Sequence, residues 1–153
     1  MTVAATVPGV SLHATFTDDT IRLHLARLAI ADAKGYVRGR EDIGEYMVGE
    51  VQDNLDGQRL YDGSAMPQSK AAIARKGKTL IDKHHLYDSY VFQLVPGGVA
   101  VGSNMVYALI HHEGGQTGRG HKTKIVARPV LGVAAAQEKR IGDILLAEIE
   151  AMQ

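Results

Sequence analysis

The residues of this sequence best suited to chemistry are two adjacent histidines and a glutamate, His111-His112-Glu113, at the mouth of a glycine-rich stretch. Such side chains serve as zinc ligands and general bases. Adjacent histidines make a poor pair of ligands, because neighbours on a strand point to opposite faces and neighbours on a helix diverge by about 100°. A metal site would have to join one of His111 and His112 to one of His84 and His85, with His121 or Glu113 as a further candidate ligand. We therefore interpret them as half-exposed polar residues at strand ends, with a small metal-dependent hydrolase as the alternative.

The other familiar catalytic arrangements are missing from the sequence. No serine stands in a Gly-x-Ser-x-Gly turn. Cysteine is absent, which excludes thiol nucleophiles, thiolate zinc sites and disulfides. The glycines of residues 114–120 are not followed by the Lys-Ser/Thr of a phosphate-binding loop. We predict no catalytic residue, no bound metal and no cofactor, so the protein is not expected to be an enzyme.

The charge balance argues against a general affinity for nucleic acid. Seventeen basic residues match seventeen acidic ones, and the sequence pI is about 7.1. The local cluster Lys70, Arg75, Lys76 and Lys78 is interpreted as a solvated helix end. An adaptor protein that touches DNA through such a cluster is the second alternative.

Length and hydropathy indicate one domain. A chain of 153 residues is long enough to bury a core of its own. No segment approaches the ~20 apolar residues of a membrane span, and the first residues lack the pattern of a signal peptide. We therefore expect one domain over residues 1–153, made in the cytoplasm and without membrane contact.

Hydrophobic periodicity predicts a mixed set of elements. In the first half of the chain we expect a strand at 10–16, a helix at 19–33, a charged connection at 34–41, a helix at 41–55, a loop at 56–68 and a short helix capped by Ser69. In the second half we expect a strand at 86–95, a turn at 96–98, a return strand from Val99, a short strand at 106–111, an edge strand at 125–131 and a final helix at 134–152. Strands and helices do not alternate regularly. This order predicts an α+β fold with helices packed on one face of a small antiparallel sheet. The glycine-rich and basic residues 113–124 are expected to form a flexible loop or arm.

Four segments of the sequence form a distinctive series, in this order: MPQSKAAIARK at 66–76, TLIDKHHLYDSY at 79–90, VAVGSNMVYALIHHEGG at 99–115 and VARPVLGV at 126–133. Together they resemble the phage virion morphogenesis family, tail-completion proteins of the Mu-like G protein kind. The third segment is the most specific. The chain departs from the family pattern at Met66, His84 and Glu113, and a turn at His84, where glycine is usual, must avoid or tolerate a positive φ.

The resemblance implies a structural virion protein with a tail-terminator-like fold. Such a protein would sit at the head–tail junction, complete or terminate the tail and join it to the head as a homo-oligomeric ring, for which we expect six copies. Its partners would be tail tube or sheath proteins and head-side connector proteins, with passive contact to DNA in the channel. It would be found in the tail or neck of the virion, and in the host cytoplasm during assembly.

The resemblance also assigns roles to particular residues. Gly102 and Gly132 would be structural turn residues, and His111 a structural or interface histidine rather than a catalytic one. Arg128, held extended by Pro129, would project its guanidinium to clasp a carboxylate. The residues expected at a subunit or partner interface are Tyr107, His111, Glu113, Gly114, Gly115, Arg119, His121, Lys122, Lys124, Arg128 and Pro129.

Overall fold

The structure, a computed structural model, describes residues 2–7, 10–15, 26 and 36–151. The fold is α+β, as predicted, with three two-stranded antiparallel sheets among these residues. The strand expected at 10–16 is confirmed as β2 (Val10–Thr15), and it pairs with an unpredicted strand, β1 (Thr2–Val7). The helix expected at 19–33 lies outside the described residues, apart from Ala26.

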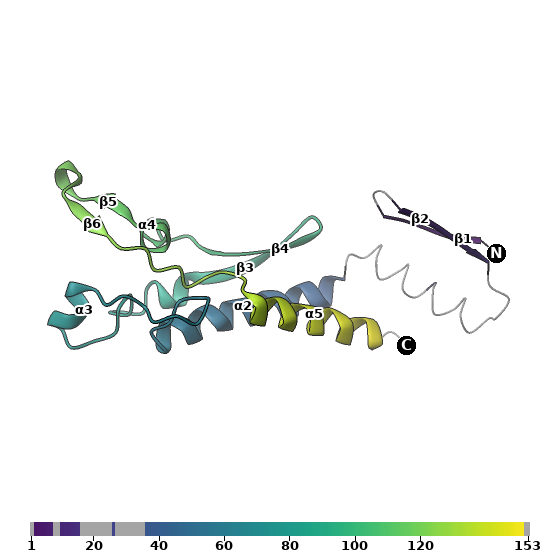
Figure 1. Cartoon of the computed structure of the whole chain (residues 1–153), viewed down its shortest axis with the longest axis horizontal. Coiled ribbons are helices and arrows are strands. Elements are labelled where there is room, and N and C mark those ends of the chain that lie inside the picture. The colour runs from purple at the N-terminus through teal and green to yellow at the C-terminus, as the bar shows by residue number, and fades with distance from the viewer. Residues whose placement is uncertain (1, 8–9, 16–25, 27–35, 152–153) are drawn as a thin grey trace.

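Helix α2 (Val37–Asp56) is the axis of the main body (Figure 1). It begins before the predicted residue 41, so residues 37–40 are helical rather than part of a connection. Ile43, Met47 and Val51 recur every four residues, and all three are buried. This apolar face explains why the sequence predicted the helix well.

A β-hairpin covers α2. Strand β3 (Tyr90–Val95) pairs with β4 (Gly98–Ser103), with Tyr90 opposite Ser103. The strand predicted from residue 86 begins at Tyr90, because a short 3-10 helix, η1 (Tyr87–Ser89), precedes it. The ring of Phe92 lies directly on Gly44 of α2, where an added Cβ would collide with it. Glycine at this position therefore lets the helix and the hairpin approach closely.

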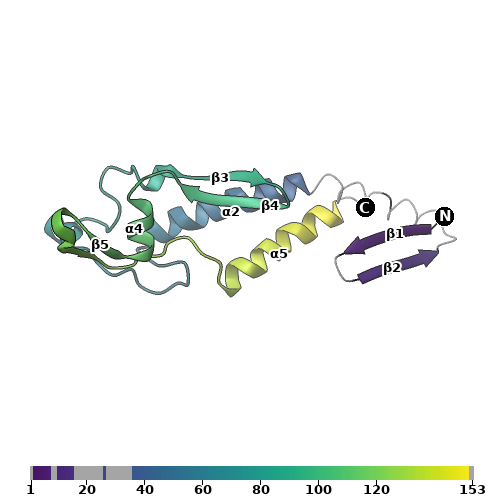
Figure 2. The same ribbon diagram turned by 90° about the horizontal axis from the view of Figure 1, so that it is seen from above.

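Helix α5 (Ala135–Glu150) packs along α2 and confirms the predicted final helix. The Gly39 N–H at the start of α2 donates to the Glu148 carboxylate at 2.8 Å. Gln137 Nε2 donates to the Glu50 carboxylate at 2.9 Å. Figure 1 shows both helices on the same side of the β3–β4 hairpin, and Figure 2 shows α5 running beside α2.

The core lies around the second half of α2. Its buried apolar residues are Val51, Leu55, Met66, Ile81, Leu86, Tyr90 and Val130. The irregular segment predicted at 56–68 is confirmed, and Ser69 caps helix α3 (Lys70–Ala74) as expected, its hydroxyl accepting from the Ala72 N–H at 3.1 Å. His84 has a φ of 61°, so the turn there adopts a left-handed conformation without glycine. In the part of the chain described, no helix is long and apolar enough to cross a membrane.

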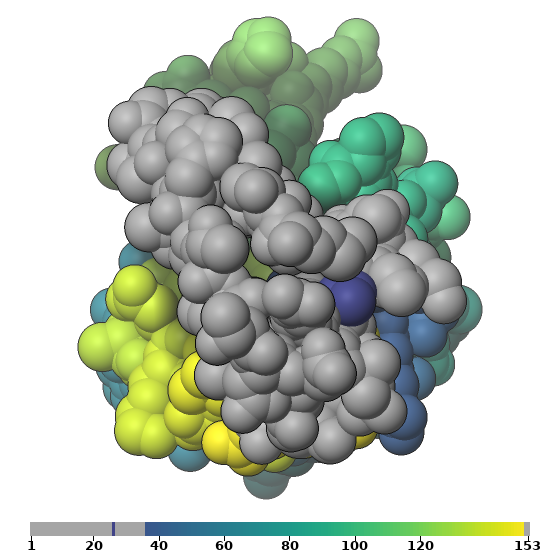
Figure 3. Space-filling model, turned by 90° about the vertical axis from the view of Figure 1, so that its right-hand side faces the viewer, coloured from purple at the N-terminus to yellow at the C-terminus, as the bar shows by residue number. Residues whose placement is uncertain are grey.

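The described body, formed by residues 36–151, has two distinct ends. One end carries α3 and a second hairpin, β5 (Gly115–Thr117) with β6 (Thr123–Ile125) (Figures 1 and 2). The other end carries the first turns of α2 and the last turns of α5. Figure 3 looks at this second end, where the blue start of α2 and the yellow end of α5 both face the viewer.

Candidate interaction surface

The predicted interface residues fall on α4 (Ala108–Glu113), the β5–β6 hairpin and the segment that follows it. The structure brings these elements to one end of the described body, where α3 also lies (Figure 1). A groove runs between them and α3. Tyr107, Glu113, Arg119, His121, Lys122 and Lys124 are exposed there. Their proposed role in contacts with other chains stays a prediction.

The strand predicted at 106–111 is wrong, because these residues lead into helix α4. The apolar run VYALI suits either element by pattern alone. Gly114 decides it: its N–H bonds to the Ile110 carbonyl at 2.9 Å, and its φ of 75° ends the helix as glycine commonly does. His111 and His112 therefore stand in the last turn of a short helix, not at the end of a strand.

The segment 113–124 is more regular than the loop we predicted. Gly115 pairs with Ile125 and Thr117 with Thr123, and a 3-10 helix, η2 (Arg119–His121), forms the tip of this hairpin. Of the edge strand predicted at 125–131, only Ile125 belongs to β6. Pro129 instead accepts a hydrogen bond at its carbonyl from the Tyr61 N–H at 3.0 Å.

The glycines singled out in the sequence differ in how closely they pack. An added Cβ on Gly114 would lie 2.8 Å from the Ala127 nitrogen, and one on Gly115 2.9 Å from Ile110 Cδ1, so both pack tightly within the chain. Gly102 lies inside β4, paired with Val91, so the predicted turn there is wrong, and an added Cβ would meet no atom of the described residues within 4 Å. Gly132 instead allows close packing, because an added Cβ would lie 2.5 Å from the Tyr61 ring.

Arg128 is an internal residue, only 5% exposed. Its Nε donates to the Pro67 carbonyl at 2.6 Å and its Nη1 to the Val126 carbonyl at 3.1 Å. Carbonyl oxygens thus replace the carboxylate that we expected. The side chain ties the segment after β6 to the loop before α3, and this tie fixes one wall of the groove relative to the other.

His111 packs against this arginine. The Arg128 N–H donates to the His111 carbonyl at 2.8 Å, and the Tyr107 ring meets the imidazole edge to face at 6.1 Å. His111 Nδ1 is buried and has no hydrogen-bond partner among the described residues. Burial, and secondly the positive charge of Arg128, lower the pKa of His111 below its usual 6.5. The imidazole is therefore held neutral at pH 7, as a packing residue would be.

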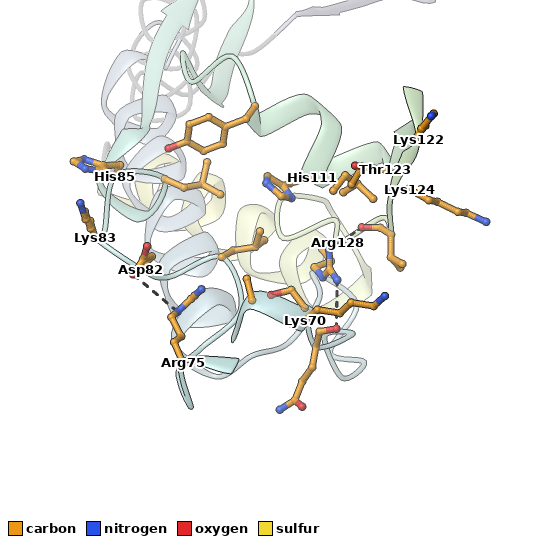
Figure 4. Close-up of a pocket in the computed structure, with 18 residues that line it drawn as sticks. Lys70, Arg75, Asp82, Lys83, His85, His111, Lys122, Thr123, Lys124 and Arg128 are labelled. Carbon is orange, nitrogen blue, oxygen red and sulfur yellow. Dashed lines mark hydrogen bonds and ion pairs between the residues drawn. The ribbon is translucent and has the colours of Figure 1, made fainter. Parts of the chain in front are cut away.

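The groove itself has a volume of about 1120 Å³ and is strongly cationic. In Figure 4, Lys83 and His85 lie on one wall and Lys122 and Lys124 on the other, with His111 and Arg128 between them. Asp82 is the one acidic side chain among its lining residues, and Arg75 approaches it at 3.9 Å. The basic residues that line the groove are Lys70, Arg75, Lys83, Lys122, Lys124 and Arg128.

Analysis of the total charge missed this surface. Residues 70–85 and 114–128 together hold nine of the seventeen Lys and Arg of the chain, but only one of its seventeen Asp and Glu. The signal was present in the sequence as the absence of any acidic residue from 114 to 137. Lys70 and Lys83 join Lys122 and Lys124 only because the fold places α3 opposite the β5–β6 hairpin.

The two histidine pairs do not form a metal centre in the structure. His85 and His111 both line the groove, whereas His84 packs edge to face against Tyr87 at 5.6 Å. Within residues 36–151 and the other described segments, no three His, Asp or Glu side chains are grouped closely enough to hold a metal ion.

Comparison with known proteins identifies the family of the chain. The sequence profile of the phage virion morphogenesis family matches residues 18–150, so the chain belongs to this family and has a structural role in phage virion morphogenesis. Over 81 residues it is 35% identical to the Mu-like prophage FluMu G protein 2 of Haemophilus influenzae (strain ATCC 51907 / DSM 11121 / KW20 / Rd). That alignment covers 53% of this chain and 59% of the relative, less than two thirds of its length. No solved structure matches the chain.

Proposed function

We propose that this chain is a structural protein of the head–tail junction of a tailed phage, which completes or terminates the tail and joins it to the head as a ring. Family membership supports the virion role. The proposed contacts with other chains rest on one observation, an exposed apolar surface beside the cationic groove. Val106 is 96% exposed and Leu109 is 64% exposed, both at α4. Burying such side chains against another chain stabilises the contact by roughly 25 cal/mol per Å².

A ring also requires two different surfaces on each copy, because each subunit meets its neighbour head to tail. The described body offers such surfaces at its two ends. We expect six copies, with a tail-terminator-like fold, whose remaining faces contact tail tube or sheath proteins and head-side connector proteins. DNA would pass through the channel with passive contact only.

Complementation of a phage that lacks this chain tests the proposal. Without the chain, filled heads and tails should accumulate unjoined, as seen by electron microscopy of the lysate. The wild-type chain should restore infectious particles, whereas the double variant Val106→Asp/Leu109→Asp should not, although its thermal unfolding is unchanged. Val133→Asp is the matched control, because Val133 is 57% exposed and lies away from α4. Normal particles without the chain would refute the proposal.

A further inference from the structure

The outer face of α2 carries the opposite charge to the groove. From Glu41 to Asp56 the helix has six carboxylates and neither lysine nor arginine. Glu41, Asp42 and Glu45 are exposed, and they lie on the side of the helix opposite its buried apolar face. Arg38 on the same face and Arg140 of α5 lie beside Asp42 and Glu45. The described part of the chain therefore has cations gathered at the groove and this mainly acidic face along α2.

A glycine in the middle of this face points to a close contact. Gly49 lies inside α2, and an added Cβ would meet none of the described atoms within 4 Å. Glycine inside a helix costs about 1 kcal/mol relative to alanine. Gly44 offsets that cost by admitting Phe92, but Gly49 has no such reason within the part of the protomer described. Its bare backbone can admit another chain.

We infer that the acidic outer face of α2 docks in the cationic groove of a second copy of this chain. The charges are complementary: the groove is lined by six Lys and Arg side chains and by one carboxylate. Among the described residues, Lys70, Lys83, Lys122 and Lys124 form no ion pair within the chain.

The geometry makes this contact heterologous. The first turns of α2 and the groove lie at opposite ends of the described body, so a copy that fills its neighbour's groove leaves its own groove open for the next (Figure 1). Repetition of such a contact gives a ring when the rotation closes. The inference rests on the proposed function for the ring, and it adds which two surfaces meet. Duplex DNA is the alternative occupant of the groove, and it would leave the acidic face of α2 without a partner.

A charge-swap experiment on the full chain tests the inference. The groove variant is Lys70→Glu/Lys122→Glu/Lys124→Glu, and the helix variant is Glu41→Lys/Asp42→Lys/Glu45→Lys. Wild-type protein should assemble, with a dissociation constant that rises with salt. Each variant alone should assemble about a hundredfold more weakly, because like charges then face each other. An equimolar mixture should assemble again, because every contact then joins opposite charges.

Analytical ultracentrifugation and native mass spectrometry give the readout, with circular dichroism to verify that each variant folds. Lys76→Glu is the control, an exposed cation close to α3 that does not line the groove, and it should assemble like wild type. Recovery of assembly in the mixture would support the docking and exclude misfolding as the reason why each variant fails alone, because misfolded variants would not rescue each other.

Three results would overturn the inference. Wild-type assemblies that persist in the groove variant would exclude this docking but leave the ring intact. A wild-type chain that stays monomeric up to its solubility limit would exclude self-docking, while particle yield would still decide the proposed function. Binding of labelled duplex DNA that is lost in the groove variant, without self-assembly, would assign the groove to DNA.

Discussion

Replacement of Arg128 by alanine should destabilise the protomer, because this side chain holds two distant segments together. It is 5% exposed and donates to the Pro67 carbonyl at 2.6 Å, to the Val126 carbonyl at 3.1 Å and, more weakly, to the Gln68 carbonyl at 3.5 Å. A hydrogen bond from a charged donor contributes about 1.5–3 kcal/mol. Relief of the buried charge and hydration of the freed carbonyls offset part of this. We expect Arg128→Ala to lower the free energy of unfolding by about 2–4 kcal/mol, or roughly 5–15 °C in Tm for a chain of this size.

Two further variants separate this explanation from a general effect of charge. Arg128→Lys keeps the charge but loses the planar fork that reaches both carbonyls, so it should recover little of the loss. Arg119→Ala removes an exposed arginine at the tip of the β5–β6 hairpin and should stay within about 0.5 kcal/mol of wild type. Urea unfolding followed by circular dichroism gives all three values. Infectious-particle yield should fall more for Arg128→Ala than for Arg119→Ala. A change below about 0.5 kcal/mol for Arg128→Ala would refute the reasoning.

Three other predictions follow from the packing around this surface. Gly132→Ala should lower the free energy of unfolding by about 1–3 kcal/mol, because the new methyl group collides with Tyr61. In urea unfolding, the double variant Gly132→Ala/Tyr61→Ala should lose less stability than the sum of the losses of the two single variants. Strict additivity would contradict the contact. The folded chain resists protonation of His111, so the unfolded chain binds more protons as the pH falls through about 6.5. The stability of the wild-type protein should therefore fall in this range, and the stability of His111→Gln should fall less. Equal slopes of Tm against pH for the two proteins would contradict this. The segment 113–124 should exchange its amide protons rapidly in the free protein and slowly in particles, because two three-residue strands are marginal alone; strong protection in the free protein would contradict this.

The long elements were predictable because periodicity extends over several turns. The residues that repeat along α2, from Ile43 to Leu55, define one buried face, and the turn around Gly97 fixes the β3–β4 hairpin. The short elements were not predictable in the same way. At Tyr107–Glu113 the same apolar run suits a strand or a helix, and a single glycine with a positive φ selects the helix.

The candidate surface depends on contacts that sequence order hides. No pattern in the sequence indicated that the Arg128 side chain donates to the Pro67 carbonyl, 61 residues away along the chain. Lys70 and Lys122 likewise lie in segments that show no relation until the fold sets them on facing walls. Total charge concealed this polarity, because an even count of acids and bases says nothing about where each sign gathers.

The most direct measurement of the central claim is an electron cryomicroscopy reconstruction of the neck of complete particles that contain this chain. The proposed function predicts a closed ring of copies, six by our expectation, between the head-side connector and the last ring of the tail. Density for this chain only inside the capsid, or along the whole tail, or its absence from finished particles, would contradict a role at the head–tail junction.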